Sequence, residues 1–218
     1  NGKPRELVAG DFVYSFKRFM DPKLHSPWQF LLEGKITGLD ELATEAQKSG
    51  RFDYDKKIEG LAAVDNYTLR IRLKAPDYNF NYIMAHASFG ALAREVVEAY
   101  NKDIIAHPVG TGAYLLKEWK RRNRIVLEAN PGYRGFIWNF KSSGDPADEQ
   151  LIREMQGKTM PQIGRIEISI IEEPQSIWLA FRGKQIDTVN VPQQFIREVL
   201  DKDQLAEHFR SEGIRLFR

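Results

Sequence analysis

The sequence contains no cysteine, which excludes disulfides, thiolate nucleophiles and cysteine-based zinc sites. No apolar run approaches the roughly 18 residues that a membrane-spanning helix needs. Residues 1–10 lack the apolar segment of a secretory signal peptide, so we expect no targeting signal in them. The 32 basic and 30 acidic side chains are interspersed and leave a formal charge of +2. This balance argues against nucleic acid or an anionic membrane as a partner and favours a globular protein.

Local catalytic patterns are also missing from the sequence. His25, His86, His107 and His208 are far apart, and neither a His-Glu-x-x-His nor a Gly-x-Ser-x-Gly pattern occurs. The adjacent pair Glu172-Glu173 could act as acid and base, but neighbouring residues at a strand end point in opposite directions, which favours a solvated edge. We therefore name no catalytic residue, metal ligand or cofactor. A hydrolase or transferase whose site is assembled only by the fold stays open.

Two other segments could be either a phosphate or nucleic-acid site or an ordinary turn. Gly110-Thr111-Gly112 precedes a strand pattern and lacks the Lys-Ser/Thr of a phosphate-binding loop, so we interpret it as a turn in which glycine permits positive φ. The basic cluster at 117–124 contains Trp119 as its only aromatic residue, whereas stacking platforms for nucleic acid need several. A charged hairpin turn is the favoured interpretation.

Hydrophobic periodicity predicts both helices and strands along the chain. Apolar residues at three- and four-residue spacing predict a first helix over 12–20 that stops before Asp21-Pro22. Alternation of Leu69, Ile71 and Leu73 with polar residues predicts a half-buried strand. Helices are also expected at 27–33, 39–48, 80–87, 93–100, 175–181 and 194–200. Strands are expected at 67–74, 113–119, 125–129, 165–171 and 186–189, with a last apolar segment at 214–217 and an exposed loop at 141–146. This alternation indicates an α/β architecture.

Several of these blocks together resemble a known family. They are the segments 2–4 (Gly-Lys-Pro), 9–18 (Ala-Gly-Asp-Phe-Val-Tyr-Ser-Phe-Lys-Arg), 58–76 (from Ile-Glu-Gly-Leu to Lys-Ala-Pro), 108–114 (Pro-Val-Gly-Thr-Gly-Ala-Tyr) and 124–133 (from Arg-Ile-Val-Leu to Asn-Pro-Gly-Tyr). The order and spacing are similar to those of the peptide-binding family of extracellular solute-binding proteins that feed ABC importers. The strand pattern at 165–171 and the segment 179–187 continue the resemblance.

The resemblance implies a type II periplasmic-binding-protein-like α/β fold of two partial lobes, with mixed sheets and flanking helices. Residues 1–107 would form the second, smaller domain without its first strands, and residues 108–218 part of the first β-domain. The glycines at 110 and 112 would serve the turn between these domains. Because family members are usually more than twice this long, we expect the chain to be a central fragment, with an export signal before Asn1 and a further lobe after Arg218.

The resemblance also implies a function, namely capture of peptides or a related small solute and delivery to the permease subunits of an ABC importer. It implies no cofactor, a periplasmic or cell-surface lipoprotein location, and membrane contact only through the permease or an anchor outside this chain. In peptide-binding relatives an aromatic residue after a Ser-Pro pair reaches toward the ligand, and Ser26-Pro27-Trp28 occupies that place. Trp28 is therefore the candidate ligand-binding residue. The alternative is an indole packed between two helices.

The chain departs from the family pattern in two places. Val8 stands where relatives usually carry a Thr or Ser that caps the first helix, so that cap must come from elsewhere or be weaker by about 1 kcal/mol. Residues 136–155 look like an insertion, which contains Trp138 and a helix-like stretch at 148–156. We interpret the insertion as a surface elaboration, and a contact with an importer partner is the alternative.

Overall fold

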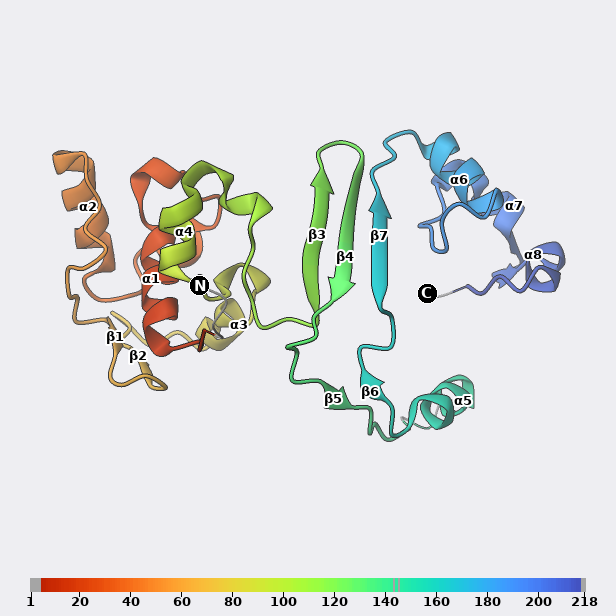
Figure 1. The fold of residues 1–218 in the computed structure, drawn as a ribbon, viewed down its shortest axis with the longest axis horizontal. Helices are drawn as coiled ribbons and strands as arrows, with labels where there is room; N and C mark the ends of the chain where they lie inside the picture. The colour runs from red at the N-terminus through yellow and green to blue at the C-terminus, as the bar shows by residue number, and fades with distance from the viewer. Residues whose placement is uncertain (1–4, 143, 145, 217–218) are drawn as a thin grey trace. The chain divides into compact units, whose positions relative to one another are not determined.

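The computed structural model describes residues 5–142, 144 and 146–216. The motif at 2–4, two positions of the 141–146 loop (Ser143 and Asp145) and the end of the last apolar segment lie outside the described residues. The chain divides into two compact units, Asn1–Gly112 and Ala113–Arg218, which we describe separately (Figure 1). The division falls where the sequence predicts a joint, near Gly110. Assignment of the units to particular domains of a solute-binding protein stays a prediction.

Helix α1 (Ala9–Phe19) opens the first unit and is held at its start by an acidic side chain. Val8 has no side-chain oxygen, so it cannot cap the helix as Ser or Thr would. The Asp11 carboxylate accepts a hydrogen bond from the Val8 N–H at 2.9 Å and forms an ion pair with Arg5. The Ala9 N–H donates to the carbonyl of Asn66 at 2.7 Å. The N–H groups of Val8 and Ala9 at the start of the helix therefore find acceptors in Asp11 of the helix and in Asn66 of the turn before β2.

The core of the first unit joins α1 to α2 (Leu39–Ser49) and to the two short strands of the unit. Its buried side chains are Phe16, Met20, Leu32, Ile36, Leu39, Leu42, Ala43, Ala46, Phe52, Leu61, Phe80 and Phe89. Each large apolar side chain removed from water contributes about 1.5–3 kcal/mol to folding before the entropy cost is counted. Helix α1 begins three residues before its predicted range, whereas α2 matches its own and ends at Gly50, whose φ of 68° suits glycine.

Two predictions for the first unit are wrong in extent. The helix expected at 27–33 is only a 3-10 turn, Gln29–Leu31, preceded by another 3-10 turn, Pro22–Leu24. The strand expected at 67–74 is β2 (Leu69–Ile71), which pairs antiparallel with β1 (Leu61–Ala63). It ends because the Arg72 carbonyl accepts from the Thr37 N–H, although the Arg72 N–H still donates to Gly60 beside β1. Local periodicity could not show this bond to Thr37.

Two short α-helices, each followed by a 3-10 segment, come after β2 in the first unit. The helix expected at 80–87 divides into α3 (Phe80–Met84) and a 3-10 turn, Ala87–Phe89. Helix α4 (Arg94–Tyr100) matches its prediction and leads into a 3-10 helix, Asn101–Ala106. None of the helices in the described part of the chain is both long and apolar enough to cross a membrane.

The second unit is built on a three-stranded antiparallel sheet of β3 (Tyr114–Lys120), β4 (Arg124–Ala129) and β7 (Arg165–Ser169). Figure 1 shows β4 between the other two strands. The predicted hairpin is confirmed, with a register shift between Leu116 and Glu118. Val126, in the central strand, is buried.

The segment 136–155, identified as an insertion, forms the first strand and the helix of a strand–helix–strand element of the second unit. Strands β5 (Phe136–Ile137) and β6 (Thr159–Met160) pair antiparallel, and α5 (Pro146–Met155) lies between them in the sequence. The helix-like stretch expected at 148–156 is therefore confirmed as a helix that starts slightly earlier. The described positions of the 141–146 loop are exposed, as predicted.

The rest of the second unit packs around Trp178 of α6 (Pro174–Arg182). It contains a 3-10 turn, Gln193–Phe195, and then α7 (Ile196–Val199), β8 (Leu200–Asp201), β9 (Gln204–Leu205) and α8 (Glu207–Ser211). The strand expected at 186–189 is wrong, because no neighbouring strand among the described residues pairs with it. The helix expected at 194–200 is split between the 3-10 turn and α7. In the last apolar segment, Ile214 and Leu216 pack against the Trp178 cluster.

Candidate ligand-binding surface around Trp28

The loop after α1 is fixed to the first unit before it reaches Trp28. The buried Asp21 carboxylate accepts a hydrogen bond from the Tyr54 hydroxyl at 2.5 Å and from the Lys23 N–H at 3.0 Å. Burial and this hydrogen bond to Asp21 raise the pKa of Tyr54 above its usual value, so the hydroxyl stays a donor at neutral pH. Asp21 thereby starts the 3-10 turn that leads to Ser26-Pro27-Trp28.

Trp28 lies at the surface of the first unit. Its backbone N–H donates to the Ser26 hydroxyl oxygen at 3.3 Å, which forms a tight local turn. The residue is 38% exposed, and its indole lies 6.3 Å from the ring of Phe30 and 4.6 Å from that of His86, measured between centroids. We call the exposed rings of Trp28, Phe30 and His86 the Trp28 surface.

His86 and Phe30 belong to this surface, although the sequence singles out only Trp28. His86 comes from the turn after α3, and no local pattern connects it to Trp28. The Ser88 N–H donates to His86 Nδ1 at 3.3 Å, which places the proton of the neutral ring on Nε2. An exposed N–H donor therefore lies beside the indole.

The Trp28 surface rests on the core of the first unit. The His86 ring meets the buried Phe89 ring edge to face at 6.4 Å. Phe89 in turn packs against Phe16 at 5.5 Å and Phe19 at 4.7 Å, both on α1. Because close-packed aromatic neighbours restrict side-chain motion, the surface is held in position by the folded core.

A cavity of about 410 Å³ in the first unit is lined by Ser26 and Ser88, which hydrogen-bond to Trp28 and His86 of the Trp28 surface. We call it the Arg18 hollow, and its lining residues are Ser15, Arg18, Phe19, Leu24, Ser26, Ala87, Ser88, Gly90, Ala91 and Leu92. The Leu92 N–H donates to Ser15 Oγ at 2.8 Å, and that hydroxyl donates to the Asp11 carbonyl at 2.7 Å. These two bonds fix the wall at 87–92 against α1.

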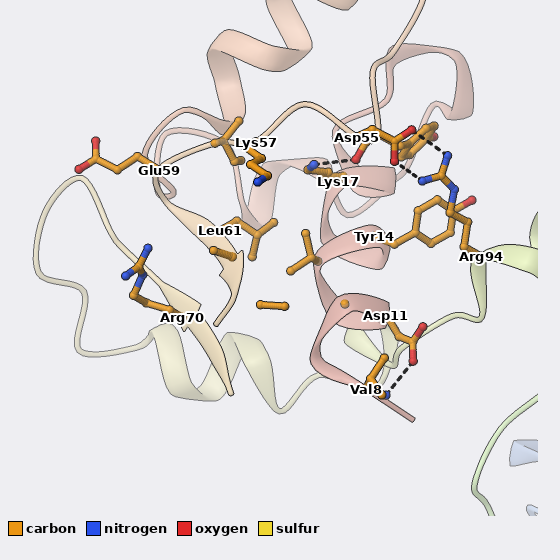
Figure 2. Close-up of a pocket in the computed structure, with 16 residues that line it drawn as sticks. Val8, Asp11, Tyr14, Lys17, Asp55, Lys57, Glu59, Leu61, Arg70 and Arg94 are labelled. Atoms are coloured by element: carbon orange, nitrogen blue, oxygen red, sulfur yellow. Dashed lines mark hydrogen bonds and ion pairs between the residues drawn. The ribbon is translucent and has the colours of Figure 1, made fainter. Parts of the chain in front are cut away.

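A second cavity of the first unit, of about 750 Å³, lies beside α1 and β1 (Figure 2). Figure 2 shows Asp55 facing Arg94 and the Asp11 carboxylate facing Val8. Lys17 Nζ donates to the carbonyls of Tyr54 at 2.7 Å and Lys56 at 2.8 Å. Desolvation by burial lowers the pKa of Lys17, and the nearby carboxylates partly oppose that effect. Asp11, Lys17, Asp55 and Arg94 of this cavity therefore already have partners within the protein.

The other histidines are not brought to the Trp28 surface. His107 stacks on Tyr100 with ring centroids 3.8 Å apart, His208 lies against Phe209, and His25 is an exposed residue with a φ of 48°. Among the described residues, no group of three or more His, Asp and Glu side chains could hold a metal ion.

Two further interpretations from the sequence have different outcomes. The charged hairpin is confirmed, since Lys120 and Arg124 both pair with Glu118, at 3.5 Å and 2.6 Å. The positive φ expected at Gly110 and Gly112 is wrong, because neither glycine adopts that conformation. The chain bends there with ordinary backbone angles, and a Cβ built on either glycine would meet no other atom within 4 Å.

Comparison with known proteins adds what the geometry alone does not show. The periplasmic oligopeptide-binding protein OppA of Escherichia coli K12 is 33% identical over 138 residues, which are 61% of this chain and 23% of that protein. The dipeptide-binding protein DppE of Bacillus subtilis 168 is 26% identical over 209 residues, which are 93% of this chain and 32% of that protein. The chain thus spans about a quarter of the length of OppA and about a third of the length of DppE.

Solved structures share the fold of this chain. The murein tripeptide binding protein MppA of Escherichia coli matches it with a TM-score of 0.66 and 24% identity, over 91% of this chain and 34% of that one. This likeness confirms the expected periplasmic-binding-protein-like α/β class. Residues 1–217 match the family described as bacterial extracellular solute-binding proteins, family 5 Middle. The chain therefore belongs to the family 5 extracellular solute-binding proteins of bacteria.

Proposed function

We propose that the protein carrying this chain is the substrate-binding component of an ABC importer, which captures peptides or a related small solute. The observation that carries the proposal is the family match over residues 1–217. Relatives named as oligopeptide- and dipeptide-binding proteins support peptides as the solute class. The solute would then pass to the permease subunits of the importer.

The location follows from the same relationship. The family is extracellular, and its Escherichia coli relative is periplasmic. We propose a periplasmic or cell-surface lipoprotein location, with contact to the membrane through the permease or a lipid anchor.

The mechanism requires binding and release without a chemical step. Solute-binding proteins with two lobes close around a ligand, and the ligand stabilises the closed state by contacting both sides. We place the Trp28 surface on one side of that cleft, because it offers an exposed indole and the His86 Nε2–H on a rigid support. An aromatic face suits the apolar part of a peptide, and the imidazole N–H suits a carbonyl.

Absence of turnover separates this proposal from a hydrolase or transferase. A panel of peptidase, esterase and transferase substrates should stay at buffer background with the intact natural protein. Turnover that is lost when one of His25, His86, His107 or His208 is changed to Ala would instead establish an enzyme whose site is assembled by the fold.

Ligand identification is the direct test of the proposed function. The intact natural protein that carries this chain should be purified without denaturation, and its bound small molecules identified by mass spectrometry. We expect peptides, and the peptide found should bind the ligand-free protein in calorimetry with a Kd in the micromolar range or tighter. A ligand-free preparation that binds no peptide would contradict the proposal.

Changing Trp28 to Ala tests the residue assignment. In the intact protein Trp28→Ala should weaken peptide binding by about 1–3 kcal/mol, the range of a buried aromatic anchor. The control is Tyr78→Ala, because Tyr78 is 94% exposed and takes no part in the Trp28 surface. A lower melting temperature with unchanged affinity would show that the indole only packs against its neighbours.

A further inference from the structure

Arg18 is a half-buried cation without an acidic partner. No carboxylate in the described part of the chain lies within ion-pair distance of its guanidinium. Its contact is with Tyr14, whose ring centroid lies 5.8 Å from Arg18 Cζ and whose hydroxyl oxygen is 3.5 Å from one terminal nitrogen. A guanidinium has five N–H donors, and only the one facing Tyr14 has a hydrogen-bond partner among the described residues. Arg18 also lines the cavity.

The other half-buried arginines of the described residues show the usual arrangement. Arg94 pairs with Glu98 at 2.6 Å, Arg124 with Glu118 at 2.6 Å, and Arg182 with Glu212 at 3.1 Å. A partly desolvated cation normally has such a partner because unpaired burial is costly. Arg18 departs from this arrangement.

The acid nearest to Arg18 in the sequence is engaged elsewhere. The Asp21 carboxylate accepts from the Tyr54 hydroxyl and the Lys23 N–H, and both bonds hold the loop that leads to Trp28. Asp21 cannot turn toward Arg18 without breaking them. Both carboxylate oxygens of Asp21 are thus used by donors other than Arg18.

The walls of the Arg18 hollow suit a small anion. Besides Arg18 they offer the hydroxyls of Ser26 and Ser88, and small residues leave the space open. Ser26 also accepts the Trp28 N–H, and the Ser88 N–H donates to His86, so the hollow and the Trp28 surface share their supports. Arginine binds carboxylates with two parallel hydrogen bonds, which gives both affinity and orientation.

We infer that the Arg18 hollow is a carboxylate subsite of the ligand-binding surface, with Arg18 as the specificity-determining residue. The inference rests on the proposed function and adds which part of the ligand is recognised there. The carboxylate belongs either to the C-terminus of a peptide or to an acidic side chain. The apolar part of the same ligand then lies on the Trp28 surface.

The test compares three peptides and three variants of the intact natural protein by calorimetry. The peptides are Ala-Phe-Ala, its C-terminal amide, and the C-terminal amide of Ala-Glu-Ala. The variants are Arg18→Gln, Arg18→Lys and the control Arg51→Gln, since Arg51 is exposed and outside the hollow. Arg18→Gln breaks no ion pair among the described residues, so its melting temperature should stay close to that of the wild type.

The wild type and Arg51→Gln should bind the free acid roughly 10- to 100-fold more tightly than its amide, as a hydrogen-bonded charge pair predicts. Arg18→Gln should lose that preference, and Arg18→Lys should keep part of it, because lysine retains the charge without the forked geometry. If the glutamate-containing amide binds as tightly as the free acid, and only with Arg18 present, the carboxylate comes from a side chain.

Two outcomes distinguish failure of the carboxylate subsite from failure of peptide binding. Equal binding of acid and amides by the wild type, unchanged in Arg18→Gln, would overturn the carboxylate subsite while leaving peptide binding intact. Failure of the wild type to bind any of the three peptides would count against peptide capture itself and remove the subsite with it.

Discussion

Asp11 links the start of α1 to the N-terminal segment through one nearly buried carboxylate. Its side chain is 5% exposed and accepts bonds from Arg5 and from the Val8 N–H. Burial alone would raise the pKa of this group, but Arg5 and the backbone donor hold the pKa below its usual value of 3.8. A carboxylate whose pKa is lower in the folded state stabilises the fold above the unfolded pKa and loses that effect as the pH falls.

Asp11→Asn should therefore destabilise the first unit by about 1–2 kcal/mol at pH 7, where the charged hydrogen bonds are lost. The difference from the wild type should shrink as the pH falls below about 3.8, because the wild-type carboxyl then becomes neutral as well. Urea unfolding followed by the amide NMR signals of α1 measures both effects. Asp201→Asn, at an exposed position of β8, is the control and should show no such dependence.

Individual residues of the candidate site were predictable only where a motif surrounds them. Trp28 could be selected because Ser26-Pro27 precedes it in a family pattern. His86 and Arg18 could not, since their roles depend on contacts with residues distant in the sequence, namely Trp28 for His86 and the wall at 87–92 for Arg18. The sequence indicated that Val8 lacks a capping oxygen, but the acceptors that Asp11 and Asn66 provide at the start of the helix appear only in the folded unit.

At the level of elements, prediction succeeded where one periodic pattern decides the structure. The first helix and the β3–β4 hairpin match because each carries its own apolar face and its own stop signal. The strand expected at 67–74 is shorter than predicted and the one at 186–189 does not form, because strand formation depends on a neighbouring partner. The carbonyl of Arg72 bonds to Thr37 instead of continuing the ladder, and no pattern within the strand indicates this.

The hairpin turn offers a test with two neighbouring arginines. Arg122 has a φ of 57°, a left-handed conformation that costs a non-glycine residue about 1–2 kcal/mol. Arg122→Gly should remove that cost. Part of the gain is offset because glycine makes the unfolded chain more flexible, so the hairpin should become more stable by about 0.5–1 kcal/mol. Urea unfolding followed by the amide NMR signals of β3 and β4 measures the change.

Arg121→Gly is the matched control for the turn. Arg121 does not have a positive φ, and its guanidinium lies 6.0 Å from the ring centroid of Trp119. The glycine should therefore destabilise the hairpin by about 0.5–1 kcal/mol, opposite in sign to the change at Arg122. Destabilisation by both glycines would show that the left-handed conformation carries no cost here.

For the whole molecule, the family relationship indicates the function more directly than the cavities of the structure do. The order of the motifs predicted the family and the fold class, and both are confirmed. The ligand could not be predicted, because ligand specificity depends on side chains that are distant in the sequence and come together only in the folded protein. The chain covers 23% of OppA and 32% of DppE, so most of the length of these relatives lies outside the matched regions.

The last prediction compares the isolated 218-residue chain with the intact natural protein. Small-ligand sites usually enclose most of the ligand, whereas the Trp28 surface offers exposed rings beside a cavity of about 410 Å³. A single wall leaves the polar groups of a peptide in water and contributes few of the contacts that offset the entropy of binding. Calorimetry should therefore find no peptide Kd tighter than about 1 mM for the isolated chain, roughly −4 kcal/mol, against a micromolar or tighter value for the intact protein. Micromolar binding by the isolated chain, lost in Trp28→Ala, would show instead that these residues already enclose the ligand.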